Sequence, residues 1–506
     1  MIAHTFAAML LGLSPLKIEI EVDGSQGIPH LLFIGLTSQA TDEAKERITS
    51  ALLNCGIRVR SKRTVVNLAP AEIPKSGSGF DLAIAIGLLK MYGEIKTPTD
   101  DTLFLGELSL DGTVKKVKGA LPLAIAAKKF GFKHVIFPEG NSEEVSILSG
   151  IALHPVHHLN QYLAFARKPT KYPLPTLLPL SYANIKAEPL FDIDYADIRG
   201  QEFTKRALLI AAAGGHHILM HGPPGVGKSL LAKAFISIMP PLTESEVVEV
   251  TSIHSVFDVK NLGLWTVPPF RAPHHTTSAS GLIGGGRELR PGEISLAHRG
   301  VLFLDEFLEF NKAAIEALRQ PLEEGTISLA RAIGSTTFPA QFILIAACNP
   351  CPCGYFGTNI KQCLCSRHAI DFYQKKLSGP IYDRFDLHVP VKEIEFKELV
   401  ENTPENKQTS AYYVERVKRA RELQAKRYLG QPFTLNSQLS SKLTSKYIRL
   451  SSESRNFIHQ AVGKLKLSGR SYFKLLKTAQ TIADLDEESH TQIVEERHIA
   501  EALQYR

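Results

Sequence analysis

Eight consecutive residues have the types and spacing of a loop that binds the phosphates of a nucleoside triphosphate. Glycines in such a loop let backbone N–H groups turn towards the phosphates, a lysine can neutralise the β- and γ-phosphates, and a hydroxyl can bind Mg²⁺. The pattern G-x-x-x-x-G-K-[ST] is matched by Gly222, Pro223, Pro224, Gly225, Val226, Gly227, Lys228 and Ser229. We therefore expect ATP and Mg²⁺ as cofactors, with Lys228 on the phosphates and Ser229 on the metal.

The segments around this loop fit its predicted role. Residues 217–220 predict a short buried strand and residues 230–235 predict a helix, which is the strand–loop–helix order that the motif requires. The N-terminal end of such a helix carries partial positive charge and faces the same anion. Residues 222–229 are therefore interpreted as a nucleotide-binding loop rather than a Gly- and Pro-rich surface loop.

Two carboxylates follow an apolar run further along the chain. Residues 301–304 predict a central strand of a parallel sheet, and Asp305 and Glu306 come directly after it. There Asp305 can hold Mg²⁺, while Glu306 can orient and deprotonate the attacking water. Residues 341–348 predict another buried strand, which delivers Asn349 to the same edge, where an amide can help to position the water. ATP hydrolysis is the predicted chemistry.

Two arginines have a place in the same chemistry. Arg384 lies on a loop after the predicted strand over residues 341–348. From this loop a guanidinium can reach the γ-phosphate of a nucleotide bound to a neighbouring subunit. The alternative for Arg384 is a surface ion pair with Asp383 or Asp386. Arg470 lies at the start of a predicted helix near the C-terminus, from which it can touch the nucleotide. Both arginines are therefore candidate catalytic residues.

Five of the six cysteines cluster in one short stretch of the chain. In a chain without a secretory signal, such clustering favours a metal over disulfides. Two Cys-x-Cys pairs can surround Zn²⁺ tetrahedrally and staple a polar loop. Each pair has one intervening residue, which is fewer than the two to four usual in zinc sites. Cys348 or His368 could therefore replace one of the four ligands. The alternative to a zinc site is a set of reduced thiols without a metal. The candidate zinc ligands are Cys351, Cys353, Cys363 and Cys365.

The composition is that of an ordinary soluble protein with two or three domains. Of 506 residues, 44% are hydrophobic and 22% charged, and no apolar run reaches the roughly 18 residues of a membrane span. Residues 1–13 lack the basic flank of a secretory signal, so we expect a cytoplasmic protein without a membrane partner. The net charge of +7 makes nucleic acid a plausible partner, although charge alone is weak support.

The N-terminal part of the chain, residues 1–167, predicts an α/β domain. Alternating polar and apolar residues indicate a strand pair over residues 17–36. A helix from residue 41 that stops at Gly56 follows. A strand over residues 64–68 and a buried helix over residues 81–89 come next.

Proline content and helical periodicity divide the rest of the chain. Residues 168–192 are rich in proline without periodicity and predict a linker. Residues 193–392 form the predicted ATPase core and residues 393–506 a helical lid. Along residues 416–427, basic side chains cover one helix face, an arrangement that is most often just solvated.

Part of the N-terminal region resembles the proteolytic domain of Lon proteases. That family's pattern P-K-x-G-x-S-A-G carries the nucleophilic serine, and Gly79 stands at the serine position here. The lysine of the catalytic dyad aligns with Pro122. Ser78 or Lys118 can replace these groups only within hydrogen-bond reach of a partner and with a lowered lysine pKa, neither of which the spacing assures. We therefore expect a scaffold for assembly or binding rather than a peptidase.

A long insertion separates the phosphate-binding loop from the acidic strand. It contains His274 and His275, which as neighbours in a regular element would point apart and chelate a metal poorly. A loop that faces a substrate fits this Gly- and Arg-containing stretch better. Further on, residues 326–331 and 335–338 predict a hairpin that carries Arg331 near its tip.

The motifs GPPGVGKS, VLFLDE, SGPIYDRFD and SGRSYFKLLKTAQTIADL, together with Asn349, resemble the AAA+ ATPases of the magnesium-chelatase type. The stretches FRAPHHTTS and CNPCPCGYFG, the Cys-x-Cys pairs and the Lon-like region resemble the bacterial ComM (YifB) family over nearly the whole chain. That resemblance implies a homo-hexameric helicase that uses ATP to drive branch migration of DNA during natural transformation. It also implies that Arg384 acts in trans as an arginine finger and that Arg470 is the lid sensor. His274, His275 and Arg331 would face DNA in the pore.

The predicted fold class is α/β: a Lon-protease-like domain, then a P-loop AAA+ parallel-sheet domain with a C-terminal helical lid. Two other functions compete with a DNA motor. A magnesium-chelatase-like motor that remodels or metallates a partner would share the ATPase core without responding to DNA. An ATP-dependent protease would need the dyad that is absent from the expected positions.

Overall fold

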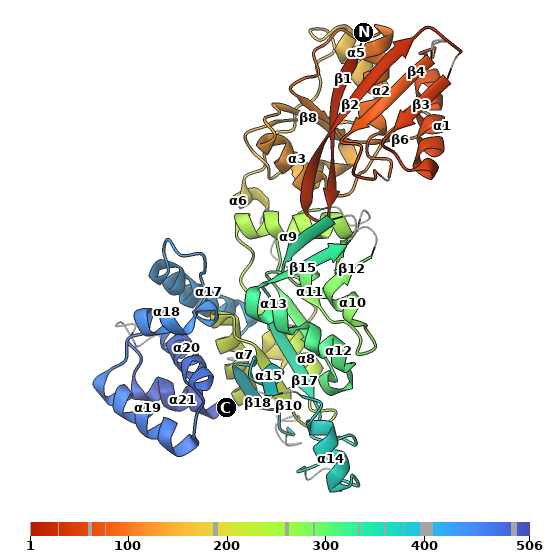
Figure 1. The fold of residues 1–506 in the computed structure, drawn as a ribbon. Coiled ribbons are helices and arrows are strands. Elements are labelled where there is room, and N and C mark those ends of the chain that lie inside the picture. The colour runs from red at the N-terminus through yellow and green to blue at the C-terminus, as the bar shows by residue number, and fades with distance from the viewer. Residues whose placement is uncertain are drawn as a thin grey trace.

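The computed structural model describes most of the chain in three parts that Figure 1 colours from red to blue. The N-terminal domain is stacked on the side of the ATPase core that carries α9 and β15, the C-terminal helices lie beside the core, and α14 projects at the far end (Figure 1). The described residues are 2–28, 30–58, 63–75, 77–185, 191–258, 263–286, 289–331, 334–358, 361–377, 379–394, 408–486 and 493–506. No helix in these ranges is both long and apolar enough to cross a lipid bilayer.

The N-terminal domain is a seven-stranded mixed sheet with helices on both faces. Its strand order is β3-β4-β2-β1-β5-β8-β9. α2 packs on one face of β1 and β2, and α3 packs on the other face of the sheet beside β5. The strands are β1 Ala3–Leu11, β2 Ser14–Ser25, β3 His30–Ile34, β4 Arg63–Ala69, β5 Thr102–Phe104, β8 His134–Pro138 and β9 Ala152–Val156, and the helices are α1 Ser38–Asn54, α2 Asp81–Tyr92, α3 Ala120–Lys129 and α5 Leu159–Arg167.

Residues next to Gly79, which stands at the position of a Lon-type nucleophile, belong to a network of polar and charged side chains. Ser78 donates a hydrogen bond to the carboxylate of Glu107, and a carboxylate is not the lysine base that a Ser–Lys dyad requires. Arg47 of α1 makes two hydrogen bonds, of 2.9 and 3.3 Å, to Asp81 at the start of α2. Burial raises the pKa of Asp81 to about 6, although Arg47 acts in the opposite direction. This network ties α1 to α2.

The ATPase core is built on a five-stranded parallel sheet. The strand order β11-β14-β17-β10-β18 places β17 between the strand of the phosphate loop and the strand of the acidic pair. In β10, β14 and β17 the predicted run of apolar residues is buried on both faces. The strands are β10 Ile218–His221, β11 Phe270–Arg271, β14 Val301–Leu304, β17 Ile343–Cys348 and β18 Leu387–Pro390, and the flanking helices include α7 Glu202–Gly214, α8 Lys228–Phe235 and α9 Glu244–Phe257.

Within the described ranges, the N-terminal domain contacts the core at α9 and at a β-hairpin. Val247 and Val250 of α9 are buried in the same hydrophobic cluster as Leu121 of α3. The β1–β2 turn meets the hairpin formed by β15 Thr326–Arg331 and β16 Gly334–Pro339, where the Leu13 N–H donates to Thr336 Oγ1 over 3.4 Å. The strands of this hairpin agree with the sequence prediction. Its docking on the N-terminal domain is a long-range contact that the sequence does not reveal.

Part of the proline-rich stretch is packed rather than extended. The Leu177 N–H donates to the Leu153 carbonyl over 2.8 Å, and the Tyr182 hydroxyl donates to the carbonyl of Leu242. The stretch therefore runs along the N-terminal domain before it reaches the core, and residues 186–190 lie outside the described ranges. The domain boundaries that we placed at 167 and 192 stay a prediction.

The lid consists of helices that bury part of their charge against the core. Arg421 donates to the Ala212 carbonyl over 2.7 and 3.0 Å, and Gln424 donates to the Ala213 carbonyl over 3.1 Å. These carbonyls end α7 and would otherwise lack partners. The expected solvation of the basic face holds for Lys418, Arg419 and Lys426, which are exposed, but not for Arg421, for which the core supplies the acceptor. The lid helices are α17 Ser410–Arg427, α18 Ser441–Tyr447, α19 Ser452–Leu465, α20 Gly469–Leu485 and α21 Glu496–Gln504.

We expect the buried ion pair between Arg427 and Asp484 to hold the lid together. Arg427 Nη2 lies 2.5 Å from Asp484 Oδ1 and Arg427 Nη1 lies 3.0 Å from Asp484 Oδ2, and both side chains are buried. Asp484→Ala should lower the free energy of unfolding by about 3–5 kcal/mol, since it leaves a buried guanidinium without its carboxylate. Glu415→Ala breaks the exposed Glu415–Arg419 pair (3.6 Å) and should cost less than about 1 kcal/mol. Urea unfolding measures both, and equal costs would contradict this role.

Candidate nucleotide-binding site

The phosphate loop joins the end of β10 to the start of α8. Gly225 and Gly227 have φ angles of 83° and 90°, a region that favours glycine. The Lys228 ammonium donates to the carbonyls of Gly222 (2.7 Å) and Pro223 (2.8 Å) and to Asn349 Oδ1 (3.0 Å). Burial lowers the pKa of Lys228. The ammonium is held at the loop, where phosphate oxygens can replace these acceptors.

The predicted magnesium ligands lie together. Ser229 Oγ donates to Asp305 Oδ2 over 2.5 Å, although the two residues are 76 positions apart. A hydroxyl and a carboxylate are oxygen donors of the kind that Mg²⁺ prefers. Glu306 follows with a φ of 49°, and its N–H donates to Asp305 Oδ1 over 2.9 Å. These oxygen atoms fit a magnesium ion, and Glu306, the predicted general base, follows directly in the chain.

Strand order explains why these groups meet. β17 pairs with β10 through His221 and Cys348, and with β14 through Leu304 and Ala346. The residues that follow three neighbouring parallel strands therefore emerge at one edge of the sheet. Asn349 follows β17, which accounts for its hydrogen bond to Lys228. The structure brings the phosphate loop, Asp305, Glu306 and Asn349 to a single site.

His275 also belongs to this site, which the sequence analysis did not anticipate. Its Nδ1 lies 3.2 Å from Glu306 Oε2. We expected His274 and His275 to face DNA, but β11 pairs with β14, so the residues after β11 lie near those after β14. The ring of His274 lies tilted by 35° against that of His275, with centroids 4.1 Å apart, and His274 Nδ1 lies 2.9 Å from Thr276 Oγ1. The signal that could have found His275 is the pairing of these two strands.

Arg384 and Arg470 lie away from the phosphate loop. Arg384 pairs with Glu323 of α13 (Arg319–Glu324) rather than with Asp383 or Asp386, and donates to the Pro380 carbonyl over 3.0 Å. Burial lowers the pKa of Arg384, and the positive charge of Arg470 acts in the same direction.

The anchoring of α20 shows which edge of the sheet these arginines occupy. Lys474 donates to the Phe385 carbonyl over 2.8 Å, and the Asp386 N–H donates to the His217 carbonyl over 3.0 Å. His217 precedes β10, whereas the phosphate loop follows it. Arg384 and Arg470 therefore lie at the opposite edge of the sheet. The contact of Arg470 with a nucleotide stays a prediction.

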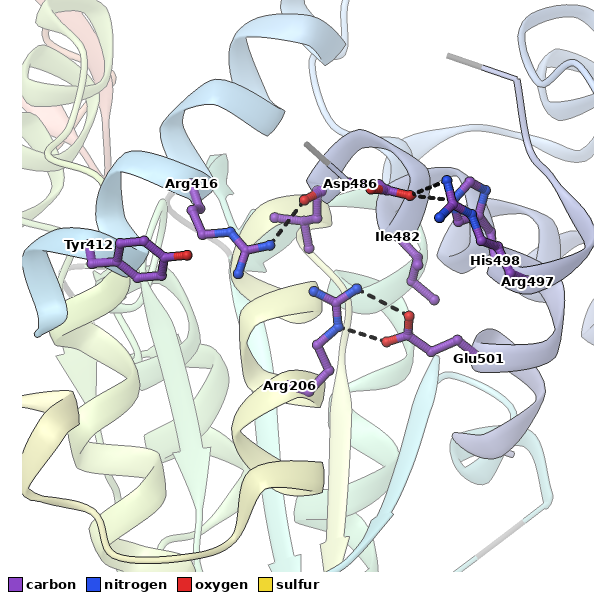
Figure 2. A pocket seen from close by; sticks show the side chains of 9 residues that line it. Arg206, Tyr412, Arg416, Ile482, Asp486, Arg497, His498 and Glu501 are labelled. Carbon is purple, nitrogen blue, oxygen red and sulfur yellow. Dashed lines mark hydrogen bonds and ion pairs between the residues drawn. The ribbon is translucent and has the colours of Figure 1, made fainter. Parts of the chain in front are cut away.

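A cavity of about 400 Å³ lies between α7 and the lid, away from the phosphate loop. Figure 2 shows Arg206 and Glu501 in its lining, joined by hydrogen bonds of 2.7 and 3.1 Å. Arg497 and His498 pair with Asp486 at 2.8 and 3.1 Å. Because the charges that line the cavity satisfy one another, we interpret it as the seam that joins the core to the lid.

The four predicted zinc ligands converge. The Sγ atoms of Cys351, Cys353, Cys363 and Cys365 all lie within 4.8 Å of one another. Three of these separations are 3.4, 3.6 and 3.7 Å, close to the roughly 3.8 Å expected for tetrahedral Zn–S bonds of about 2.3 Å. The cluster can therefore hold a metal. Cys348 is buried, which raises the pKa of its thiol to about 11.

Similarity to known proteins decides the family. Family models for magnesium chelatase subunit ChlI match residues 20–141, 194–399 and, as its C-terminal part, 407–506. Competence protein ComM of Haemophilus influenzae is 39% identical over 509 residues, which cover 100% of this chain and 97% of that protein. The chain belongs to the ComM/YifB family.

Two further similar proteins extend this result. YifB of Escherichia coli is 37% identical over 507 residues, covering 100% of this chain and 96% of YifB. The magnesium-chelatase 67 kDa subunit of Chlorobaculum tepidum is 28% identical over 165 residues, which is 31% of this chain and 23% of that subunit. The magnesium-chelatase-type AAA+ fold predicted from the sequence is confirmed, and ATPase activity is what this family suggests.

Proposed function

We propose that this ComM/YifB protein is an ATP-dependent hexameric DNA helicase and translocase of the cytoplasm. It would promote branch migration of DNA during natural transformation and homologous recombination. The observation that carries this proposal is the full-length similarity to a competence protein, together with the assembled nucleotide site. DNA, single-stranded or branched, is the proposed partner.

The site residues divide the work of hydrolysis. Lys228 and the backbone of the phosphate loop bind and orient the triphosphate, and Ser229 and Asp305 would hold Mg²⁺, which neutralises charge on the β- and γ-phosphates. Glu306 takes the proton of the attacking water. Asn349 positions that water from the end of β17.

Ring assembly completes the site. Arg384 lies just before β18, at the sheet edge opposite its own phosphate loop, which supports a contact with the nucleotide bound to a neighbouring subunit. A head-to-tail contact of this kind closes into a ring when it is repeated with a fixed rotation. A guanidinium placed there stabilises the charge that spreads over the γ-phosphate in the transition state. Glu323 holds Arg384 until that contact forms. Arg470 is proposed as the lid sensor.

A second function is favoured by the family models, all of which carry the name of a magnesium chelatase subunit. In that alternative the ATPase ring remodels a protein or metallates a partner, and DNA has no part. The nucleotide site and its completion by a neighbour would be the same. Only the response to DNA separates the two functions.

We expect ATP-driven strand displacement from a forked or three-stranded DNA. ATP should support displacement and a non-hydrolysable analogue should not, since translocation needs turnover. Binding should weaken steeply with salt, because phosphate contacts release counterions. ATPase rates measured with and without DNA provide the second readout. If DNA binding does not depend on salt and DNA does not change the ATPase rate, the helicase proposal is rejected. The chelatase-like motor is then the remaining function.

We also propose that the cysteine cluster holds Zn²⁺ and braces the phosphate loop. The cluster loop turns at Gly354, which has a φ of 86° and packs against Pro224, leaving no room for a side chain. Freshly purified protein should contain about one zinc per chain. The double variant Cys363→Ser/Cys365→Ser should lose the metal, about 3 kcal/mol of stability and some affinity for a fluorescent ATP analogue.

Cys55→Ser is the matched control for the zinc site. Cys55 is a free cysteine of the N-terminal domain outside the cluster, so its replacement should leave the zinc content unchanged. Elemental analysis measures the zinc content, and thermal unfolding measures the loss of stability. Wild-type protein with almost no zinc would refute the site.

A further inference from the structure

The loop that carries Arg384 is held by the lid of its own chain. This loop joins α15 Gly379–Tyr382 to β18, and Phe385 and Asp386 follow Arg384 within it. The Lys474 ammonium of α20 donates to the Phe385 carbonyl over 2.8 Å and lies 3.6 Å from Asp386 Oδ1. Only 8% of the Asp386 side chain and 14% of the Lys474 side chain are exposed. A buried cation of the lid therefore fixes the backbone next to Arg384.

Asp386 also joins this loop to the start of β10. Its Oδ2 accepts from the His217 N–H over 3.3 Å, and the Asp386 N–H donates to the His217 carbonyl over 3.0 Å. His216 Nδ1 lies 3.4 Å from the same carboxylate oxygen, and His216 Nε2 lies 2.8 Å from Thr481 Oγ1 of α20. One carboxylate thus connects the loop of Arg384, the sheet of the core and the lid.

The contact between Asp386 and the lid depends on a negative charge. Burial acts to raise the pKa of this carboxyl group, but Lys474 and the hydrogen bond with His216 outweigh burial and hold the pKa well below its usual range. An asparagine has nearly the same shape and can still accept from the His217 N–H, but it carries no charge that attracts an ammonium. Asp386→Asn should therefore loosen the loop from α20 with little change in packing.

These contacts can persist while Arg384 acts on a neighbouring subunit. The guanidinium must give up Glu323 when it reaches a nucleotide, because one side chain cannot serve both partners at once. Asp386 and Lys474 instead hold the backbone on the C-terminal side of Arg384, so they need not be released. A displacement of only about 1 Å at a reacting group can cost a hundredfold in rate. The placement of this backbone therefore matters for the reaction.

We propose that Asp386 and Lys474 are positioning residues for Arg384. Through them, the lid of the subunit that supplies the arginine finger sets the position of that finger at the nucleotide of the next subunit. This proposal rests on the role of Arg384 proposed above. Loss of either residue should slow hydrolysis at the neighbour's site and spare the nucleotide site of its own chain.

Mixed rings of full-length subunits separate these two effects. A Lys228→Ala subunit supplies Arg384 without hydrolysing ATP, and an Arg384→Ala subunit supplies an intact phosphate loop without a finger. Asp386→Asn added to the Lys228→Ala subunit should lower the ATPase rate of the mixture by about 10- to 100-fold, through displacement of the finger. The same change added to the Arg384→Ala subunit should leave the rate within about twofold. A merely structural role would lower both rates alike.

Further variants keep this comparison decisive. Lys474→Met keeps an apolar stem without the ammonium and gives the same test if Asp386→Asn does not fold. Lys474→Arg keeps a cation and should recover part of the loss. Asp383→Asn is the matched control, because Asp383 is exposed next to Arg384, and it should have no effect in either subunit.

The outcomes distinguish the positioning role from the finger itself. Equal losses from the two placements of Asp386→Asn and Lys474→Met, or no loss from either placement, would overturn the positioning role and leave the finger in place. If the Lys228→Ala and Arg384→Ala subunits recover no activity together without a further change, completion of the site by a neighbour fails, and the positioning role fails with it.

Discussion

Replacing Glu306 with glutamine is expected to reduce ATP turnover by about 10² to 10⁴, the contribution typical of a general base. Glutamine keeps the size and the polarity of the side chain but cannot accept the proton of water. ATP binding should be unchanged, because the phosphate loop, Ser229 and Asp305 are untouched. The variant should therefore accumulate as ATP-bound rings, visible by gel filtration with a labelled nucleotide.

Glu309→Gln is the matched control for this variant. Glu309 lies three residues further along and pairs with Lys376 at 3.4 Å on the surface. Its turnover should stay within about twofold of wild type, as expected for an exposed pair outside the reacting groups. If Glu306→Gln hydrolyses ATP at the wild-type rate, another group deprotonates the water.

Replacing Arg384 with alanine is expected to lower kcat by about 10³ or more, as for arginine fingers in general. The guanidinium stabilises charge that develops only in the transition state, so the affinity for ATP should change little. Arg384→Lys should recover only part of the activity, since an ammonium lacks the planar fork of donors. Wild-type activity per chain should fall on dilution as rings dissociate.

Arg455→Ala is the control for the loss of a cation. Arg455 is exposed on α19, so its removal should leave kcat unchanged. Single-turnover assays at saturating ATP compare the rates of hydrolysis of the variants, because differences in ATP affinity then have no effect. An Arg384→Ala protein with full activity, or wild type that keeps full activity when dilute and monomeric, would contradict completion of the site by a neighbour.

Local patterns predicted the elements of the nucleotide site well. The phosphate loop, the strand before Asp305 and the strand before Asn349 each depend on a few consecutive residues, so their types and spacing were enough. The convergence of four cysteines also followed from spacing, because both Cys-x-Cys pairs lie on one short loop. The roles of these residues stay predictions.

Contacts between segments far apart in the chain could not be predicted from the sequence. His275 meets Glu306 only because β11 pairs with β14. Lys474 meets the loop of Arg384 because the whole lid is placed against one edge of the core. Arg421 looked like a solvated cation until the end of α7 supplied its acceptor. In each case a partner far along the chain sets the environment of the side chain.

Strand β1 shows a different reason for a missed element. Several of its residues are alanine or other apolar types on both faces, so the alternation that marks β2 is weak in β1. Its position in the middle of the sheet, between β2 and β5, accounts for that composition. Helices α1 and α2 carried clearer signals and were predicted near their observed bounds.

Mixing two inactive proteins tests most directly whether each nucleotide site is completed by the neighbouring subunit. The Lys228→Ala subunit cannot bind the phosphates productively but still carries Arg384. The Arg384→Ala subunit lacks the arginine finger but keeps an intact phosphate loop. In randomly mixed rings about one interface in four pairs an intact loop with an intact finger, so mixing should restore roughly a quarter of wild-type ATPase activity. A mixture that stays inactive at every ratio, or an Arg384→Ala protein that is active alone, would contradict the account.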